Sequence, residues 1–321
     1  MINPNFPLGP ANLAWANLFL ERYVDAEKTV QQAAERQLNF PDLIMLPYVI
    51  AFYKGDRAGM ELAAARGKDN PESADWMTNT EALALAYSGH LQQARTMTRR
   101  AVDMERQAHQ SERAAMYEAG AAVREALFGN ASEARQRAKV ALGLSKGRDV
   151  EYGAAFALVL SGDIAGSRPL TNDLANRFPE DTFVRFTYLP IQRALLALSE
   201  EDSAAAIEYL EIAVPYDLAI PGSWFAFFGN MYAPYVRGQA YLSAHRYTEA
   251  VGEFQKILDH PGIVFADPVR AIAPLQLGRA LASGGDRNKA RAAYEDFLML
   301  WRDADTGIPL LKQAKAEYIK L

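Results

Sequence analysis

The hydrophobic pattern of the chain is built on pairs of small residues that stand twelve positions apart. Around each pair, apolar residues fall at three- and four-residue intervals, the spacing of an amphipathic helix, as Ile207, Leu210 and Val214 illustrate. A weaker copy carries Tyr48 and Met60 at the two places. The two-residue alternation of a strand occurs only in short ambiguous runs, so the pattern predicts an all-α fold. The small-residue pairs are Ala14 and Ala26, Ala82 and Ala94, Ala122 and Ala134, Ala155 and Ser167, Ala194 and Ala206, Gly238 and Ala250, and Gly278 and Ala290.

A glycine stands five residues before the second small residue in five copies. Glycine can end a helix in the left-handed conformation, and an Asp or Asn after it favours a turn or a new helix start. Each copy therefore predicts a helix, a tight turn and a second helix. We expect the two members of a pair, such as Gly238 and Ala250, to face each other where these helices approach closely. The five glycines are Gly55, Gly89, Gly129, Gly162 and Gly285, and all but Gly89 continue with Asp or Asn.

Successive copies lie 33 to 44 positions apart, a period typical of stacked helical repeats. We expect a single array of about eight helix pairs, because one pair cannot bury its own apolar face. The approximate repeat ranges are 8–40, 41–73, 74–108, 111–146, 148–180, 181–217, 228–261 and 267–303. A capping helix is expected over 306–321, where Pro309 can start a helix. Its apolar stripe would be Leu311, Ala314, Tyr318 and Leu321, with Lys312, Lys315, Glu317 and Lys320 outside it.

The repeats resemble tetratricopeptide repeats, whose signature runs W-x₂-L-G-x₂-Y, then A-x₃-F, then P. The last two copies carry the resemblance best. One has Gly238-Gln239-Ala240-Tyr241, Ala250 and Phe254, and the other has Leu277-Gly278, Ala290 and Tyr294. The resemblance covers residues 8–303. It implies a right-handed superhelix, an α-α solenoid, in which the first helix of each pair lines a concave groove.

Residues 215–321 also resemble the C-terminal repeat region of certain bacterial serine/threonine protein kinases. This resemblance implies a non-catalytic part of a larger signalling protein, because no kinase motif is present in the sequence. Similar repeat regions follow winged-helix DNA-binding domains, so the domain that would precede Met1 is left open. Residues 2–6 look like a junction between repeats, and we expect the chain to be a fragment. The passages that carry the resemblance are 235–238, 253–260, 294–298 with Trp301, 303–305, 308–309 and 311–318.

Composition and charge exclude several classes of function. The 34 basic and 39 acidic side chains give a net charge of −5, without the basic stripe expected for nucleic-acid binding. Cysteine is absent, which excludes disulfides, thiolate metal sites and a cysteine nucleophile. No run of 18 apolar residues exists, so we expect no membrane insertion by this segment. The compartment stays open between the cytoplasm and, behind a membrane span elsewhere in a parent protein, the extracytoplasmic side.

Catalytic and metal-binding patterns are also missing. The four histidines have no ligand spacing, and His90 and His245 fall in turns between helices. The acidic clusters Glu180-Asp181, Glu200 to Asp202 and Asp303 with Asp305 fall at turns or helix starts, where carboxylates cap helices. The segment 143–147 lacks the spacing of a phosphate loop. We therefore expect no enzymatic activity, no cofactor and no metal.

Aromatic residues of the predicted first helices are the candidate partner-binding residues. Their positions relative to the small residue would face the groove, although packing between repeats accounts for them equally well. Grooves that clamp a terminal carboxylate use Lys, Arg and Asn, and only Asn79 fits, so we expect a protein or peptide with an apolar or aromatic anchor. The candidates are Trp15, Phe19, Phe52, Tyr53, Trp76, Asn79, Tyr87, Tyr152, Phe156 and Tyr235.

Two rival hypotheses remain. A self-associating scaffold would also use an apolar groove. An α/α-toroid enzyme would show a similar repeat, but a toroid closes into a ring and gathers acids at its centre, whereas a solenoid leaves its ends apart.

Overall fold

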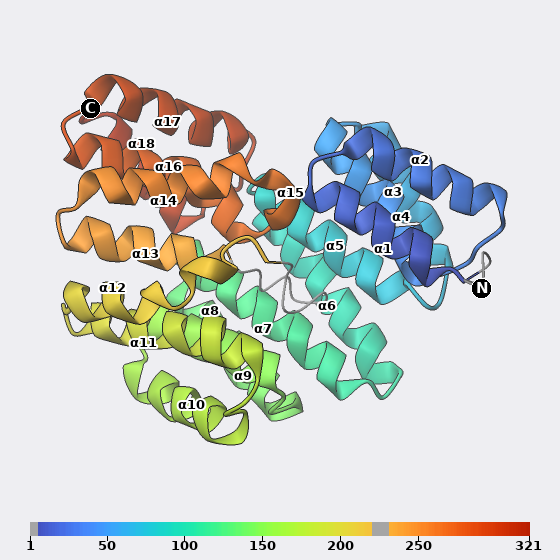
Figure 1. Cartoon of the computed structure of the whole chain (residues 1–321), viewed down its shortest axis with the longest axis horizontal. Helices are drawn as coiled ribbons and strands as arrows, with labels where there is room; N and C mark the ends of the chain where they lie inside the picture. The colour runs from blue at the N-terminus through green and yellow to red at the C-terminus, as the bar shows by residue number, and fades with distance from the viewer. Residues whose placement is uncertain (1–5, 220–230) are drawn as a thin grey trace.

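A computed structural model describes residues 6–219 and 231–321, and in these residues every regular element is a helix. The elements form eight consecutive helix pairs, a short helix between the last two pairs and a terminal helix (Figure 1). The first five pairs are α1 (Leu8–Phe19) with α2 (Tyr23–Glu35), α3 (Pro41–Lys54) with α4 (Arg57–Asp69), α5 (Ala74–Tyr87) with α6 (Leu91–Gln107), α7 (Ser111–Leu127) with α8 (Ala131–Leu144), and α9 (Arg148–Leu160) with α10 (Ile164–Arg177). The predicted all-α solenoid of eight pairs with a cap is confirmed.

The remaining pairs begin after a π-helical turn, η1 (Val184–Tyr188), which leads directly into α11. They are α11 (Leu189–Ser199) with α12 (Ser203–Glu211), α13 (Tyr232–Ser243) with α14 (Tyr247–Asp259), and α16 (Pro268–Ser283) with α17 (Arg287–Leu300). A 3₁₀ turn, η2 (Val214–Tyr216), follows α12, α15 (Pro261–Val264) precedes α16, and α18 (Pro309–Tyr318) ends the chain. Each predicted repeat range contains one pair. Residues 2–5 of the predicted junction and 228–230 of the seventh range lie outside the described residues.

In the turn between the two helices of each pair, one residue has the left-handed backbone conformation. The five predicted glycines have φ between +67° and +89°, so their assignment as left-handed helix ends is confirmed. In the three copies without glycine, Glu21, Glu201 and His245 hold the same place at φ of 60°, 61° and 58°. The following amide bonds back to the first helix, as Asp202 N does to the carbonyl of Ala197 (2.9 Å). The turn geometry is thus kept in all eight pairs even where it strains a side chain.

Aspartates after the turn glycines start the second helices. Asp56, Asp163 and Asp286 each accept a hydrogen bond from a backbone N–H three residues ahead. Asn130 departs from this prediction, because its Nδ2 donates instead to Glu125 of the preceding helix (3.0 Å).

The small residues allow close contact between the two helices of a pair, and in two pairs an aromatic ring fills the space above the glycine. A Cβ at Gly238 would lie 2.6 Å from ring atoms of Phe254, and one at Gly278 would lie 2.6 Å from the ring of Tyr294. These rings come from the second helix, four residues beyond Ala250 and Ala290. At these two positions the glycine makes room for an aromatic ring of the partner helix. The paired residues also approach each other, since a Cβ at Gly278 would lie 3.3 Å from the carbonyl oxygen of Ala290 and the Ser167 hydroxyl donates to the carbonyl of Ala155 (2.9 Å).

The terminal helix α18 packs against the last pair. Leu311 and Ala314 are buried and Tyr318 is half-buried, in agreement with the predicted apolar stripe. Glu317 was expected outside the contact, and this is wrong. Its carboxylate accepts two hydrogen bonds from Arg279 (2.9 Å each) and one from the Tyr294 hydroxyl (2.7 Å), which ties the cap to both helices of the last pair.

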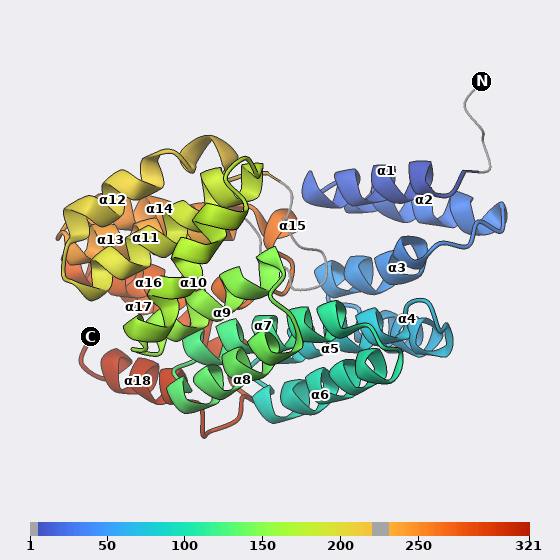
Figure 2. The same cartoon turned by 90° about the horizontal axis from the view of Figure 1, so that it is seen from below.

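The array curves until its late repeats meet its first ones. Helix α15 packs against α1, and α16 packs against α5 and α7 (Figures 1 and 2). The first helices of the pairs make these contacts, and we call the surface that they share the inner face. These contacts bridge the early and late repeats, whereas the two ends of the array, α1 and α18, lie on opposite sides of the molecule (Figure 1).

The strained turns predict a stabilising substitution. Glu201→Gly should raise the free energy of unfolding by about 0.5–1 kcal/mol, because glycine adopts a positive φ without the steric cost that a side chain pays. Glu208→Gly, in the exposed middle of the same repeat's second helix, should lower it by about 1 kcal/mol. Urea unfolding measures both free energies. If the two variants changed the free energy of unfolding in the same direction, the account of the turn would be contradicted.

The glycine–ring contact predicts that Gly→Ala substitutions at two glycines of the seventh pair change the stability in opposite directions. Gly238→Ala should destabilise by about 1–3 kcal/mol, since its Cβ would overlap the Phe254 ring. Gly252→Ala, where a Cβ would meet nothing within 4 Å, should stabilise the helix by up to about 1 kcal/mol. Thermal unfolding of both variants checks this, and an unchanged midpoint for Gly238→Ala would refute the close contact.

Candidate binding surface on the inner face

Six of the ten candidate residues are packing residues. Trp15 donates a hydrogen bond from Nε1 to Asp42 Oδ1 (2.8 Å) and fills the seam between the first two repeats. Tyr152 stacks on Tyr188 with ring centroids 3.9 Å apart, and Phe156 meets the ring of Tyr232 edge-on. The six buried candidates are Trp15, Trp76, Asn79, Tyr152, Phe156 and Tyr235, all at most 6% exposed. Their burial favours the packing alternative over partner contact.

The other four candidates are half-buried, and the structure brings three of them together. Phe52 and Tyr53 of α3 meet edge-on at 5.8 Å, and Phe52 also meets Tyr87 of α5 at 5.4 Å. Phe19 stacks on Trp15 (6.0 Å) at the neighbouring helix α1. The three rings of Phe52, Tyr53 and Tyr87 form a surface on the inner face that we call the aromatic site.

The aromatic site holds a short segment of the chain itself. Phe265 inserts its ring against Phe52 (4.7 Å) and Tyr53 (5.9 Å), and it is 3% exposed. The Tyr53 hydroxyl lies 2.9 Å from the carbonyl oxygen of Pro261 and 3.2 Å from that of Gly262, to which it donates. The site therefore contacts a side chain and main-chain carbonyls of one segment, which is how a groove binds a peptide.

Arg270 covers the same rings from α16. Its guanidinium carbon lies 5.1 Å from the ring centre of Tyr87, 5.8 Å from that of Tyr53 and 6.0 Å from that of Phe52. Its Nη1 donates to the carbonyl of Phe265 (2.7 Å). A cation over aromatic faces is attracted by their quadrupole, so Arg270 fixes both the rings and the segment that they hold.

Glycine is required where the segment meets α1. A Cβ at Gly262 would lie 2.4 Å from the carbonyl oxygen of Leu18 and 3.0 Å from that of Phe19. No real Cβ approaches a backbone oxygen so closely. The backbone of α15 is thus pressed against the C-terminal end of α1.

A buried acid lies just beyond the segment. Asp267 caps α16 by accepting from the Val269 amide (3.0 Å), and it is 2% exposed. Burial raises the pKa of Asp267 to about 8, although the Val269 amide and the Tyr232 hydroxyl act in the opposite direction. Besides Asp267, the contact carries aromatic rings, Arg270 and Glu21, whose Cγ would lie 3.0 Å from a Cβ at Gly262.

A second contact fastens the C-terminal end to the turns of the third and fourth repeats. Trp301 donates from Nε1 to the carbonyl of Tyr87 (3.0 Å), and the amide of Leu310 donates to the carbonyl of Phe128 (3.2 Å). Asp305 accepts from the amide of Gln92 (2.7 Å) and thereby caps α6, more than two hundred residues away. Sequence analysis predicted a capping role for Asp305, but the capped helix could not be inferred from spacing.

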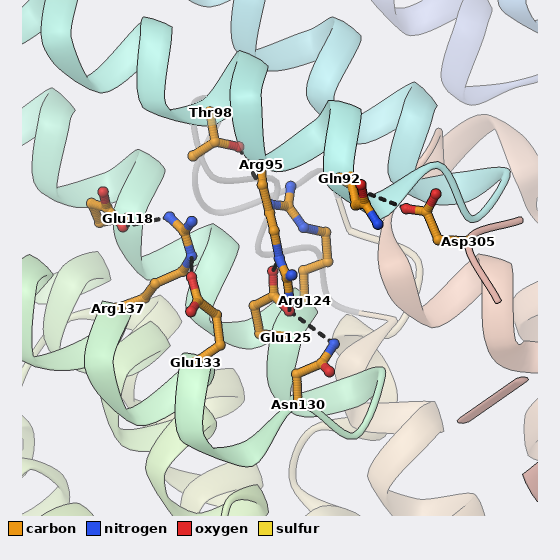
Figure 3. Close-up of polar contacts among 10 residues, drawn as sticks. All are labelled: Gln92, Arg95, Thr98, Glu118, Arg124, Glu125, Asn130, Glu133, Arg137 and Asp305. Atoms are coloured by element: carbon orange, nitrogen blue, oxygen red, sulfur yellow. Dashed lines mark hydrogen bonds and ion pairs between the residues drawn. The ribbon is translucent and has the colours of Figure 1, made fainter. Parts of the chain in front are cut away.

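A charged network on helices α6, α7 and α8 adjoins this second contact (Figure 3). Arg95 binds Glu125 through two hydrogen bonds (2.8 and 2.7 Å), and Arg137 binds Glu118 (2.9 Å) and Glu133 (2.9 Å). Arg124 is 2% exposed and donates to Thr98 (3.3 Å), and its burial lowers its pKa to about 10. Three guanidinium groups face three carboxylates, so the network is balanced and links the three helices rather than offering a site for an anion.

A cleft with a volume of about 710 Å³ lies between α2, α3 and α4. Apolar side chains of α3 form its floor, and Lys54, which is paired with Glu27 (3.0 Å), lies at its rim. The cleft lies behind α3, on the opposite side from the aromatic site.

The described residues contain neither a group of metal-ligating side chains nor a membrane-spanning helix. No three His, Asp or Glu side chains in residues 6–219 and 231–321 come together as metal ligands. In the same ranges, no helix combines the length and the hydrophobicity that crossing a bilayer requires. His90 and His245 lie in the turns where the sequence placed them.

Comparison with known proteins identifies the fold but no family. No protein-family model and no curated protein matches the sequence. A monomeric mutant of IFIT1, solved with Gppp-AAAA, superposes with a TM-score of 0.52 at 13% identity over 97% of this chain and 77% of that one. The human IFIT1 dimer with m7Gppp-AAAA gives 0.50 at 14% identity over 96% and 75%. A tetratricopeptide repeat protein from Parabacteroides merdae gives 0.47 at 10% identity over 87% and 98%.

Sequence reasoning missed the segment that fills the aromatic site. Phe265 lies between the seventh and eighth repeat ranges and Arg270 opens the eighth, so no spacing connects either residue to α3. The signal that was available is local. Pro261-Gly262 and Asp267-Pro268 bracket four residues that fit neither repeat helix, and such an insertion often has a role of its own.

The buried carboxyl predicts a pH dependence of stability. An acid with a raised pKa in the folded state holds its proton where the unfolded chain has lost it, so its contribution to stability declines as the pH rises from about 4 to 8. Asp267→Asn retains the cap and cannot ionise. Urea unfolding at pH 5 and 8.5 should therefore show the wild-type chain losing more stability than the variant. Glu105 and Glu151, whose burial raises their pKa values to about 7, contribute equally to both proteins. Equal losses would show that Asp267 is not the titrating group.

Proposed function

We propose that this chain is a non-catalytic protein-binding module that holds a short segment of a partner protein at the aromatic site. One observation carries the proposal: Phe52 and Tyr53, with Tyr87 packed beside Phe52, hold residues 261–265 through an inserted ring and through main-chain carbonyls. Neither contact depends on a particular fold of the bound segment. Aromatic residues are also the side chains that most often dominate binding energy at interfaces.

The chemistry of the site favours a protein over a nucleic acid. Phosphate binding requires free cations, whereas Arg95 and Arg137 are paired with carboxylates and Arg270 is held by rings and a carbonyl. IFIT1 was solved with Gppp-AAAA, but its likeness to this chain extends to the fold alone. The predicted absence of nucleic-acid binding therefore stays part of the proposal.

The wider setting rests on the sequence. The resemblance of residues 215–321 to the repeat region of bacterial serine/threonine kinases supports a regulatory role in a larger signalling protein. A winged-helix regulator is the alternative parent. A second copy of the chain is an alternative partner, and sedimentation at two concentrations would separate it from a monomer.

The proposal predicts which side chains a partner needs. Peptides selected from a random display library on this chain should share one aromatic residue. Tyr87→Ala should weaken their binding by about 1–3 kcal/mol, and Tyr53→Phe by about 0.5–1.5 kcal/mol through loss of the hydroxyl donor. Tyr209→Ala is the matched control, because Tyr209 is 42% exposed on α12.

Fluorescence titration measures the affinities, and the unfolding midpoint of each variant separates binding from stability. Selected peptides that bind Tyr87→Ala and Tyr53→Phe as tightly as the wild-type chain would contradict the proposed site. Turnover of a phosphoryl donor by this chain alone would contradict a non-catalytic function.

A further inference from the structure

We propose that residues 261–270 are a built-in ligand that keeps the aromatic site closed, and that a partner segment carrying an aromatic residue displaces Phe265. This inference rests on the proposed function, because it specifies which contact a partner must replace and what chemistry the partner brings. Four features of the segment support a removable ligand rather than an integral part of the core.

The first feature is the separate core of the N-terminal repeats. The buried hydrophobic cluster of α1 to α5 draws its members from residues 11–84, apart from Phe265 and Ala266. Helix α15 otherwise contributes Ile263 and Val264 to the larger cluster of the later repeats. In a repeat array each unit is stabilised by its neighbours, so the first repeats keep their own seams when the two inserted residues leave.

The second feature is backbone strain at the anchor. Phe265 has φ +47° and ψ −124°, a conformation that suits glycine and that bulky residues rarely adopt. Such strain persists only where surrounding contacts impose it, and it is concentrated at ligand clamps and switches. The ring contacts with Phe52 and Tyr53 and the Arg270 bond to the Phe265 carbonyl are the contacts that hold it.

The third feature is that the segment can dock only because residue 262 is a glycine and has no side chain. Gly262 lies in a helix with no positive φ, so its backbone would accept alanine. A Cβ there would lie 2.4 Å from the carbonyl oxygen of Leu18 and 3.0 Å from both the carbonyl oxygen of Phe19 and Cγ of Glu21, all at the end of α1. The methyl group added by Gly262→Ala therefore destabilises the docked state without disturbing the helix of the segment itself.

The fourth feature is the position of the other contact. Residues 301–310 are fixed to the third and fourth repeats by hydrogen bonds from the Trp301 indole to the Tyr87 carbonyl and from the Asp305 and Leu310 amides to the carbonyls of Gly89 and Phe128. These bonds use no residue of α15, and at Tyr87 they use the carbonyl and not the ring. The C-terminal repeats therefore stay attached when the 261–270 segment leaves the site.

The ligand class follows from the segment that now occupies the site. A partner must supply an aromatic side chain in place of Phe265 and, a few residues before it, main-chain carbonyls that accept from the Tyr53 hydroxyl. A peptide of residues 259–270, Asp-His-Pro-Gly-Ile-Val-Phe-Ala-Asp-Pro-Val-Arg, contains both elements and serves as the probe.

The first part of the test measures opening in the full chain. Because the chain has no cysteine, Val24→Cys in α2 and Asp259→Cys at the end of α14, just before the segment, allow a pair of spin labels at exposed positions. We expect one narrow distance distribution in the wild-type background, and a broader and longer one with Gly262→Ala. Phe265→Gly, which removes the anchor and the strain together, should act in the same direction. Gly252→Ala, whose Cβ meets open space, should leave the distribution unchanged.

The second part measures access to the site. The 259–270 peptide should bind Gly262→Ala about tenfold or more tightly than the wild-type chain. The apparent affinity of the site is its intrinsic affinity multiplied by the fraction of molecules in which the site is open, and Gly262→Ala increases that fraction. The same peptide with Phe265→Ala should lose this binding. Circular dichroism should show native helix content in both variants.

Each contrary outcome is distinct. An unchanged distance distribution in both Gly262→Ala and Phe265→Gly would overturn the inference that the segment is removable. Opening without binding of the 259–270 peptide would overturn its role as a ligand. The proposed function is contradicted by a different result, namely that library-selected peptides bind Tyr87→Ala and Tyr53→Phe as tightly as they bind the wild-type chain.

Discussion

The structure depends on the inability of any single helix pair to bury its own apolar face. Each pair must stack on the next, and the left-handed turn residue fixes how its two helices meet. The constraint is strong enough that Glu21, Glu201 and His245 adopt the conformation of the glycines that hold this place in other repeats. Stacked in this way, eight pairs curve until α15 and α16 reach the inner face of the first repeats. The aromatic site is a product of that curvature.

Local features of the fold could be predicted from the sequence because they are set by neighbouring residues. The five turn glycines, the capping aspartates and the stripe of α18 all act within one or two helical turns. Contacts between distant segments could not be predicted in this way. The capping of α6 by Asp305, the salt bridge of Glu317 to Arg279 and the insertion of Phe265 join residues whose separation depends on the accumulated curvature of the array.

Only the part of the candidate site that depends on local helix spacing could be predicted from the sequence. First-helix spacing identified Phe52, Tyr53 and Tyr87, and the structure brings these three together. The same spacing also selected Tyr152 and Phe156, which are buried by Tyr188 and Tyr232. Spacing alone cannot separate a ring that faces a groove from one that fills a seam, because both lie on the inner side of the helix. The distinction comes from what the rest of the chain places opposite each ring.

The central claim is that the contact between residues 261–267 and the first repeats opens independently of the remaining array. Hydrogen–deuterium exchange of the intact chain tests it most directly, because local opening and global unfolding give different protection to the same amides. The account predicts that the amides of 262–267 exchange much faster than those in the middle of α13 and α14, with a rate that barely changes in low concentrations of urea. Protection in 262–267 equal to that of α13 and α14, with the same dependence on urea, would contradict it.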